Sequence, residues 1–122
     1  MTGQVSESFP RRLRLTRAVE YQQVFKNNIK RSDASLTILV GKQTSESPRL
    51  GFAIARKQVQ KAVHRNFLKR LFRESFRKNQ DRLPQRDMVI MVRREIMLVE
   101  RAQLRAKLDH HWNSIIKQCE NC

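Results

Sequence analysis

The chain has 122 residues, of which 39% are hydrophobic, and 26 lysines and arginines against 11 acidic residues give it a formal net charge of +15. This length suits one domain with a modest core, and the hydrophobic content excludes a disordered polycation, so the positive charge predicts a polyanionic partner. The apolar runs are too short to cross a bilayer and no signal-peptide core precedes the first arginines, so we expect a cytoplasmic protein without a membrane partner.

The first predicted helix covers residues 17–28, with Thr16 as its N-cap. Three bulky side chains recur there at the i, i+3, i+4 spacing of one helix face: Tyr21, Val24 and Phe25. This face has two interpretations. An aromatic pair on a short helix commonly belongs to the core, whereas rings beside Arg14, Arg17 and Lys26 are typical of surfaces on which unstacked RNA bases stack.

Two alternating patterns, at residues 36–40 and 50–54, predict two strands that pair as a hairpin across the turn-like segment 43–48. In the second strand the bulky residues alternate with small ones, namely Gly51, Ala53 and Ala55. Because side chains alternate between the two faces of a strand, one face of this strand is nearly bare. A bare face indicates that another group approaches closely.

The clearest predicted helix covers residues 62–78, which no proline or glycine interrupts. Its apolar side consists of Phe67, Leu68, Leu71 and Phe72. On the other side, an arc of about 140° collects Arg65, Asn66, Lys69, Arg70, Arg73 and Arg77. A charged face is commonly only a solvated one, but like charges four residues apart cost helix stability, so this face favours binding to phosphates.

A buried strand at residues 88–92 and a helix at 100–117 complete the predicted elements. We therefore expect a single α+β (α/β) domain with the order α-β-β-(β)-α-β-α, in which the bracketed strand is a further short one, and a mixed sheet packed by helices. Residues 1–10 and 118–122 are expected to be flexible ends around an RNA-binding domain at 11–117.

No protein-borne active site is indicated. No two acidic residues lie closer in sequence than Glu95 and Glu100, so a carboxylate cluster for Mg²⁺ is unsupported. A structural zinc site built from His110, His111, Cys119 and Cys122 has the right residue types. However, adjacent histidines on a helix point about 100° apart, and the cysteines are nearly terminal, so free thiols are the better interpretation. We expect neither a catalytic residue nor a protein metal site.

Residues 49–77 closely resemble the signature of bacterial ribonuclease P proteins, particularly the proteobacterial form. The resemblance extends back through residues 13–25 and forward through 87–112. It implies a protein subunit that supports a catalytic RNA, which uses Mg²⁺ to remove the 5′ leader of precursor tRNA. It implies no obligate protein partner, and it implies a strand-helix-strand crossover of the rare left-handed kind.

Site residues also follow from the resemblance. The surface that docks on the catalytic RNA would comprise Arg65, Asn66, Lys69, Arg70 and Arg73. The surface that holds the single-stranded leader of precursor tRNA would comprise Tyr21, Phe25, Phe52, Arg56 and Lys57. One departure stands out, because the family's Arg-Asn-Arg triplet is Arg65-Asn66-Phe67 here, which removes one cation. Another basic RNA-binding protein, such as a ribosomal protein or an RNA chaperone, is the alternative, since composition alone fits it equally well.

Overall fold

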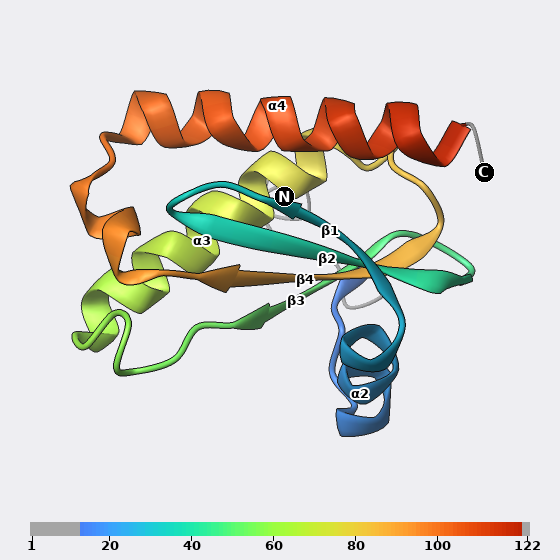
Figure 1. Cartoon of the computed structure of the whole chain (residues 1–122), viewed down its shortest axis with the longest axis horizontal. Coiled ribbons are helices and arrows are strands. Elements are labelled where there is room, and N and C mark those ends of the chain that lie inside the picture. Colours follow the sequence, from blue (N-terminus) through green and yellow to red (C-terminus); the bar gives the residue numbers. More distant parts are fainter. Residues whose placement is uncertain (1–12, 121–122) are drawn as a thin grey trace, which may run out of the picture.

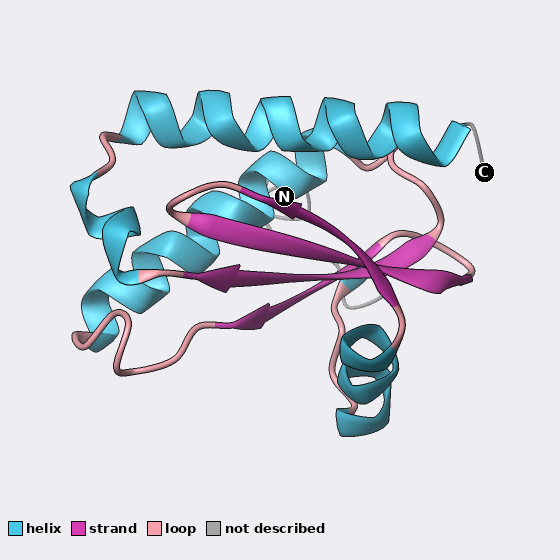
Figure 2. Ribbon diagram, in the orientation of Figure 1, coloured by secondary structure: helices cyan, strands magenta, loops and turns pink. Residues whose placement is uncertain are grey.

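A computed structural model describes residues 13 to 120 of the chain (Figures 1 and 2). The elements, in chain order, are α2 (Ala18–Lys26), β1 (Asn28–Ser32), β2 (Leu36–Thr44), β3 (Arg49–Ala53), α3 (Ala62–Asn79), β4 (Arg86–Val92), the 3₁₀ helix η2 (Arg94–Leu98) and α4 (Arg101–Glu120). The expected α+β class and the further short strand are confirmed. The expected flexible segment 1–10 lies outside the described residues, as do residues 121 and 122.

The strands form one sheet in the order β1-β2-β4-β3. β2 is antiparallel to both β1 and β4, whereas β3 runs parallel to β4. The predicted hairpin between β2 and β3 is therefore wrong, because β4 lies between them. The reason is visible in β4, where Met88, Val89 and Ile90 are fully buried, so this strand needs neighbours on both sides. α3 connects the parallel pair, and the left-handed crossover stays a prediction.

The two faces of the sheet are covered unequally (Figure 2). α3 and α4 pack on one face, over a core whose largest fully buried side chains include Phe72, Phe76 and Trp112. α2 packs on the other face near one end, where Val24 joins a small cluster with Leu15, Leu39 and Val89. No described helix covers the remainder of that second face, which we call the open sheet face.

Several boundaries differ from the expected ones. Residues 27 and 28, predicted as helix, leave α2, and Asn28 begins β1. β1 has only one apolar residue, Ile29, and it is an edge strand, which explains why hydrophobic alternation does not mark it. α4 continues to Glu120, three residues beyond its expected end, and Cys119 packs against the core. The flexible end expected from residue 118 is therefore helical as far as residue 120.

A carboxylate fixes the turn between β1 and β2 and joins it to α4. Asp33 Oδ1 accepts hydrogen bonds from the Ser35 backbone N–H and hydroxyl, both at 2.6 Å, and from the Leu36 N–H at 3.2 Å. Its Oδ2 lies 2.7 Å from Nε2 of His111, which is buried on α4. Burial by itself would raise the pKa of Asp33, but the hydrogen bonds from Ser35 and His111 outweigh it and hold the pKa well below its usual value.

We expect Asp33→Ala to lower the free energy of unfolding at pH 7 by about 1 to 3 kcal/mol, because it removes charge-assisted hydrogen bonds. A carboxyl whose pKa is depressed by folding stabilises the protein above its unfolded pKa, and that contribution is lost as pH falls towards the folded pKa. The difference between parent and variant should therefore shrink below about pH 4. Urea unfolding at pH 7 and pH 3 measures it, with Asp81→Ala, an exposed carboxylate, as the control. A difference that does not change with pH would contradict this role.

Candidate nucleic-acid interface

The outer face of α3 carries the cations that the sequence places together. Leu68, Leu71, Phe72 and Phe76 point into the core, so the opposite side of the helix faces outward. Asn66 and Arg70 are exposed there, while Lys69 and Arg73 are half-buried. In the described part of the chain, the one ion pair that involves an α3 cation is Lys78 with Glu74, at 3.5 Å. The predicted row of cations is therefore one continuous surface, largely without counter-charges.

Arg65 has a structural role that the sequence does not reveal. Its Nη1 donates hydrogen bonds to the carbonyl oxygens of Val59 at 2.9 Å and Gln60 at 2.8 Å. These two bonds tie the first turn of α3 to the loop that precedes it. Because one guanidinium nitrogen is committed to the loop, replacing Arg65 would affect folding as well as any contact with a ligand. Lys69 and Arg70 are cleaner tests of this surface.

Phe52 lies on a different face from the one expected for it. Its ring stacks on Phe72 of α3, with centroids 6.1 Å apart, and the guanidinium carbon of Arg73 lies 5.3 Å from its centroid. Burial and the nearby charge of Arg14 lower the pKa of Arg73. The expectation that the rings of Phe52 and Tyr21 share one surface is wrong, because Gly51 and Phe52 are neighbours on a strand and face opposite sides of the sheet.

Tyr21 is what approaches the bare face of β3. A Cβ atom placed on Gly51 would lie 2.5 Å from the Tyr21 hydroxyl oxygen, so no larger residue fits beneath the ring. The hydroxyl accepts a hydrogen bond from the Phe52 N–H at 3.2 Å and donates one to the Leu15 carbonyl at 3.3 Å. Leu15 in turn donates its N–H to the Leu50 carbonyl at 2.9 Å. Tyr21 therefore bridges β3 to the segment beside it and serves the fold.

Phe25 differs from Tyr21 although the two share one side of α2. Its side chain is 45% exposed, which is unusual for a phenylalanine and leaves its ring accessible to a ligand. Arg56 and Lys57 are exposed too, but they follow β3 in the segment that leads away from α2 to α3 (Figure 1). Of the five residues expected to hold a leader, the structure thus brings together Tyr21 and Phe25.

An ion-pair network absent from the sequence-based expectations holds α2 on the sheet. Arg49 at the start of β3 makes a two-pronged pair with Asp87 of β4, with N–O distances of 2.7 and 2.9 Å, and its Nη1 lies 2.7 Å from Glu20 of α2. These carboxylates raise the pKa of Arg49. Burial would raise the pKa of Glu20, but hydrogen bonds from the Arg17 backbone and Arg49 lower it. The network fixes the position of Tyr21 and Phe25 relative to the sheet.

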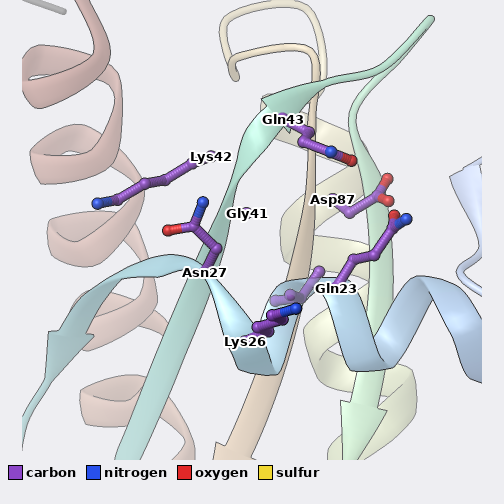
Figure 3. Close-up of a pocket in the computed structure, with 8 residues that line it drawn as sticks. Gln23, Lys26, Asn27, Gly41, Lys42, Gln43 and Asp87 are labelled. Carbon is purple, nitrogen blue, oxygen red and sulfur yellow. The ribbon is translucent and has the colours of Figure 1, made fainter.

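A hollow of about 400 Å³ lies beside α2 at the end of β2 (Figure 3). Its described lining consists of Gln23, Val24, Lys26, Asn27, Gly41, Lys42, Gln43 and Asp87. In a helical projection Gln23 lies on the opposite side of α2 from Tyr21 and Phe25. None of the described lining residues is aromatic, so the hollow offers no ring on which a base could stack. It is separate from the surface expected for a leader.

Nothing in residues 13–119 resembles a metal centre, since no three His, Cys, Asp or Glu side chains come together there. His111 contacts Asp33, and Cys119 packs against the core. The fourth residue weighed for zinc, Cys122, lies outside the described residues. None of the described helices is long and apolar enough to span a membrane.

Comparison with known proteins decides among the RNA-binding families. The family model described as Ribonuclease P matches residues 9–116. The chain belongs to the ribonuclease P protein family. The ribonuclease P protein component of Thioalkalivibrio sulfidiphilus is 41% identical over 117 residues, which cover 96% of this chain and 98% of that one. The corresponding protein of Methylococcus capsulatus is 43% identical over 111 residues, which cover 91% and 87%.

Solved structures of ribonuclease P proteins have the same fold. The Thermotoga maritima protein is 31% identical and superposes with a TM-score of 0.71 over 84% of this chain and 96% of its own. A mutant of the Staphylococcus aureus protein gives a TM-score of 0.75 over 89% of both chains at 20% identity, a likeness that concerns the fold alone. The family membership sets aside a ribosomal protein or an RNA chaperone.

Proposed function

We propose that this chain is the protein subunit of ribonuclease P, and that it binds both the catalytic RNA and the 5′ leader of precursor tRNA in the cytoplasm. The observation that carries the proposal is the outer face of α3, a row of cations on a chain that belongs to this family. A rigid row of cations gains affinity for folded RNA by releasing counterions, without reading the bases. No obligate protein partner is part of the proposal.

The docking surface for the catalytic RNA comprises Asn66, Lys69, Arg70 and Arg73. Arg65 also belongs to it and contacts both the RNA and the loop before α3. Its support is the exposure of the helix face and the scarcity of acidic residues along it. Arg73 lies where this surface meets the edge of β3, near Arg14. The same protein can therefore present two adjoining basic surfaces to RNA.

The surface for the leader comprises Phe25, the partly covered ring of Tyr21 and the open sheet face beside them. An accessible ring next to cations suits unstacked single-stranded bases, which gain stacking energy without sequence preference. Arg56 and Lys57 would contact the phosphates of a longer single strand that follows β3. Phe52 supports Arg73 rather than the leader.

Cleavage itself is assigned to the RNA. The described residues contain no group of three metal-binding side chains, so they offer no site that holds Mg²⁺ by protein ligands alone. We infer that Mg²⁺ is held mainly by the catalytic RNA and that no residue of this polypeptide is catalytic. The role of the protein is then to bind and orient the two RNAs.

The purified protein alone is expected to leave precursor tRNA uncut at every Mg²⁺ concentration, and addition of the catalytic RNA should produce cleavage at the leader junction. Gel electrophoresis of labelled precursor tRNA measures this. Contaminating RNA is removed beforehand with a calcium-dependent nuclease, which chelation of calcium then inactivates. Sustained cleavage by the protein after that treatment would overturn the assignment of catalysis to RNA.

A further inference from the structure

A cation from α4 lies against the basic surface of α3. The guanidinium carbon of Arg101, the first residue of α4, is 4.4 Å from the centroid of the Phe67 ring. Phe67 is half-buried and packs against the core, while Arg101 is exposed. In a helical projection Phe67 lies about 60° from Arg70, at the border of the basic arc. Arg101 therefore stands next to that arc although it comes from another helix.

The position of Arg101 does not follow from the needs of its own helix. A cation at the N-terminal end of a helix is disfavoured by the helix dipole, whose positive end lies there. In the described part of the chain the Arg101 side chain has no ion pair, although Glu100 immediately precedes it. The contact with Phe67 is the interaction that places it.

Stacking on a ring prepares a guanidinium for phosphate. The Phe67 ring beneath the guanidinium carbon attracts the cation and restricts the motion of the long side chain. The N–H groups lie in the guanidinium plane, so a stacked arginine keeps them for a bidentate contact with phosphate oxygens. The positive end of α4 adds to the attraction for an anion at this point.

We propose that Arg101 is a further phosphate-binding residue of the surface that docks on the catalytic RNA, and that Phe67 is the platform that positions it. The surface then spans α3 and α4, and α4 supplies the cation that position 67 lacks. This inference rests on the proposed function, since it adds a contact to the same RNA interface.

The test compares binding of the catalytic RNA to full-length variants over a range of salt concentrations. Arg101→Met keeps the ring covered but removes the charge, and it should raise Kd about tenfold and reduce the salt slope by about one counterion. Arg105→Met is the matched control, because Arg105 is one turn further along α4 and lines a small hollow with Glu74 and Asp109. It should change neither quantity. Thermal melts of both variants should match the parent.

Two further variants test the platform. Phe67→Leu preserves an apolar side chain but removes the ring face, so it should weaken RNA binding when Arg101 is present and have no further effect in the Arg101→Met background. Phe67→Arg combined with Arg101→Met should restore affinity and salt slope, because it puts the cation back on α3. Failure of that restoration, or additive effects of Phe67→Leu and Arg101→Met, would overturn the platform role.

Lys69→Met separates this inference from the proposed function. If Lys69→Met weakens binding and Arg101→Met leaves Kd and slope unchanged, the role of Arg101 is refuted while the docking surface stands. If neither variant weakens binding, the docking surface itself is refuted. Equal losses of RNA affinity in Arg101→Met and Arg105→Met would mean that binding depends only on the net charge of the protein. This result too would refute a specific contact by Arg101.

Discussion

Replacing Lys69, Arg70 and Arg73 together with alanine should weaken binding to the catalytic RNA by about a thousandfold or more, because each lost phosphate contact removes about 1.5 kcal/mol or more. A plot of the logarithm of the binding constant against the logarithm of the salt concentration should also become less steep. Its slope should change by about 0.9 for each phosphate that is no longer neutralised. All three cations share the outer face of α3, where the sole acidic residue of that helix, Glu74, pairs with Lys78. Filter binding between 50 and 300 mM salt measures both effects, in a range where phosphate contacts dominate.

A second triple variant controls for the loss of three positive charges. Arg105, Lys107 and Lys117 lie on α4 beyond its first turn, which carries Arg101, and their replacement with alanine lowers the net charge equally. It should have a much smaller effect on affinity and slope. Similar losses in both triple variants would mean that the whole field of the protein attracts RNA and that α3 is no docking surface. Arg73 covers Phe52, so melts of each variant are needed as well.

Local patterns in the sequence are sufficient to predict the helices and the basic face. α3 has no proline or glycine, its apolar residues recur at helical spacing, and most of its cations fall on the other side, so one segment contains the whole signal. The same is true of the alternation that marks β2 and β3. Strand order is different, because it depends on which segments pair. β4 follows β3 by more than thirty residues and yet separates it from β2.

The candidate site was predictable where it lies on one helix and less so where it joins distant segments. The small residues of β3 correctly indicate a close neighbour, but only the structure identifies it as Tyr21, which lies thirty residues before Gly51. Arg49 pairs with Glu20 and Asp87, at separations of 29 and 38 residues, and no local pattern marks such a network. Phe52 is a different case. The family resemblance assigns it to the leader surface, whereas strand alternation places its ring on the side of α3, against Phe72.

Phe25→Ala should lower the affinity for precursor tRNA by about 1 to 3 kcal/mol and leave mature tRNA, which lacks the leader, nearly unaffected. The ring is 45% exposed, so its removal leaves little cavity and the melting temperature should stay close to that of the parent. The affinities of the reconstituted complex for precursor and mature tRNA are measured in parallel, for parent and variant. The loss of affinity for precursor tRNA relative to mature tRNA is the quantity that tests the prediction. Val19→Ala is a suitable control, because Val19 is another exposed apolar residue of α2. Equal losses for precursor and mature tRNA would exclude stacking on the leader.

Tyr21 should respond differently, because its ring covers Gly51 and its hydroxyl joins two backbone segments. Tyr21→Phe leaves the Phe52 N–H and the Leu15 carbonyl without that partner and should cost about 0.5 to 1.5 kcal/mol of stability. Tyr21→Ala should cost about 2 kcal/mol or more, since it also uncovers the sheet. If Tyr21 serves the fold alone, Tyr21→Phe will melt lower and yet discriminate precursor from mature tRNA as the parent does. If the ring also stacks on the leader, Tyr21→Phe will retain that discrimination and Tyr21→Ala will lose it even at temperatures where the variant is fully folded. Loss of discrimination in Tyr21→Phe itself would contradict both roles, because that variant keeps the ring and changes only the hydroxyl.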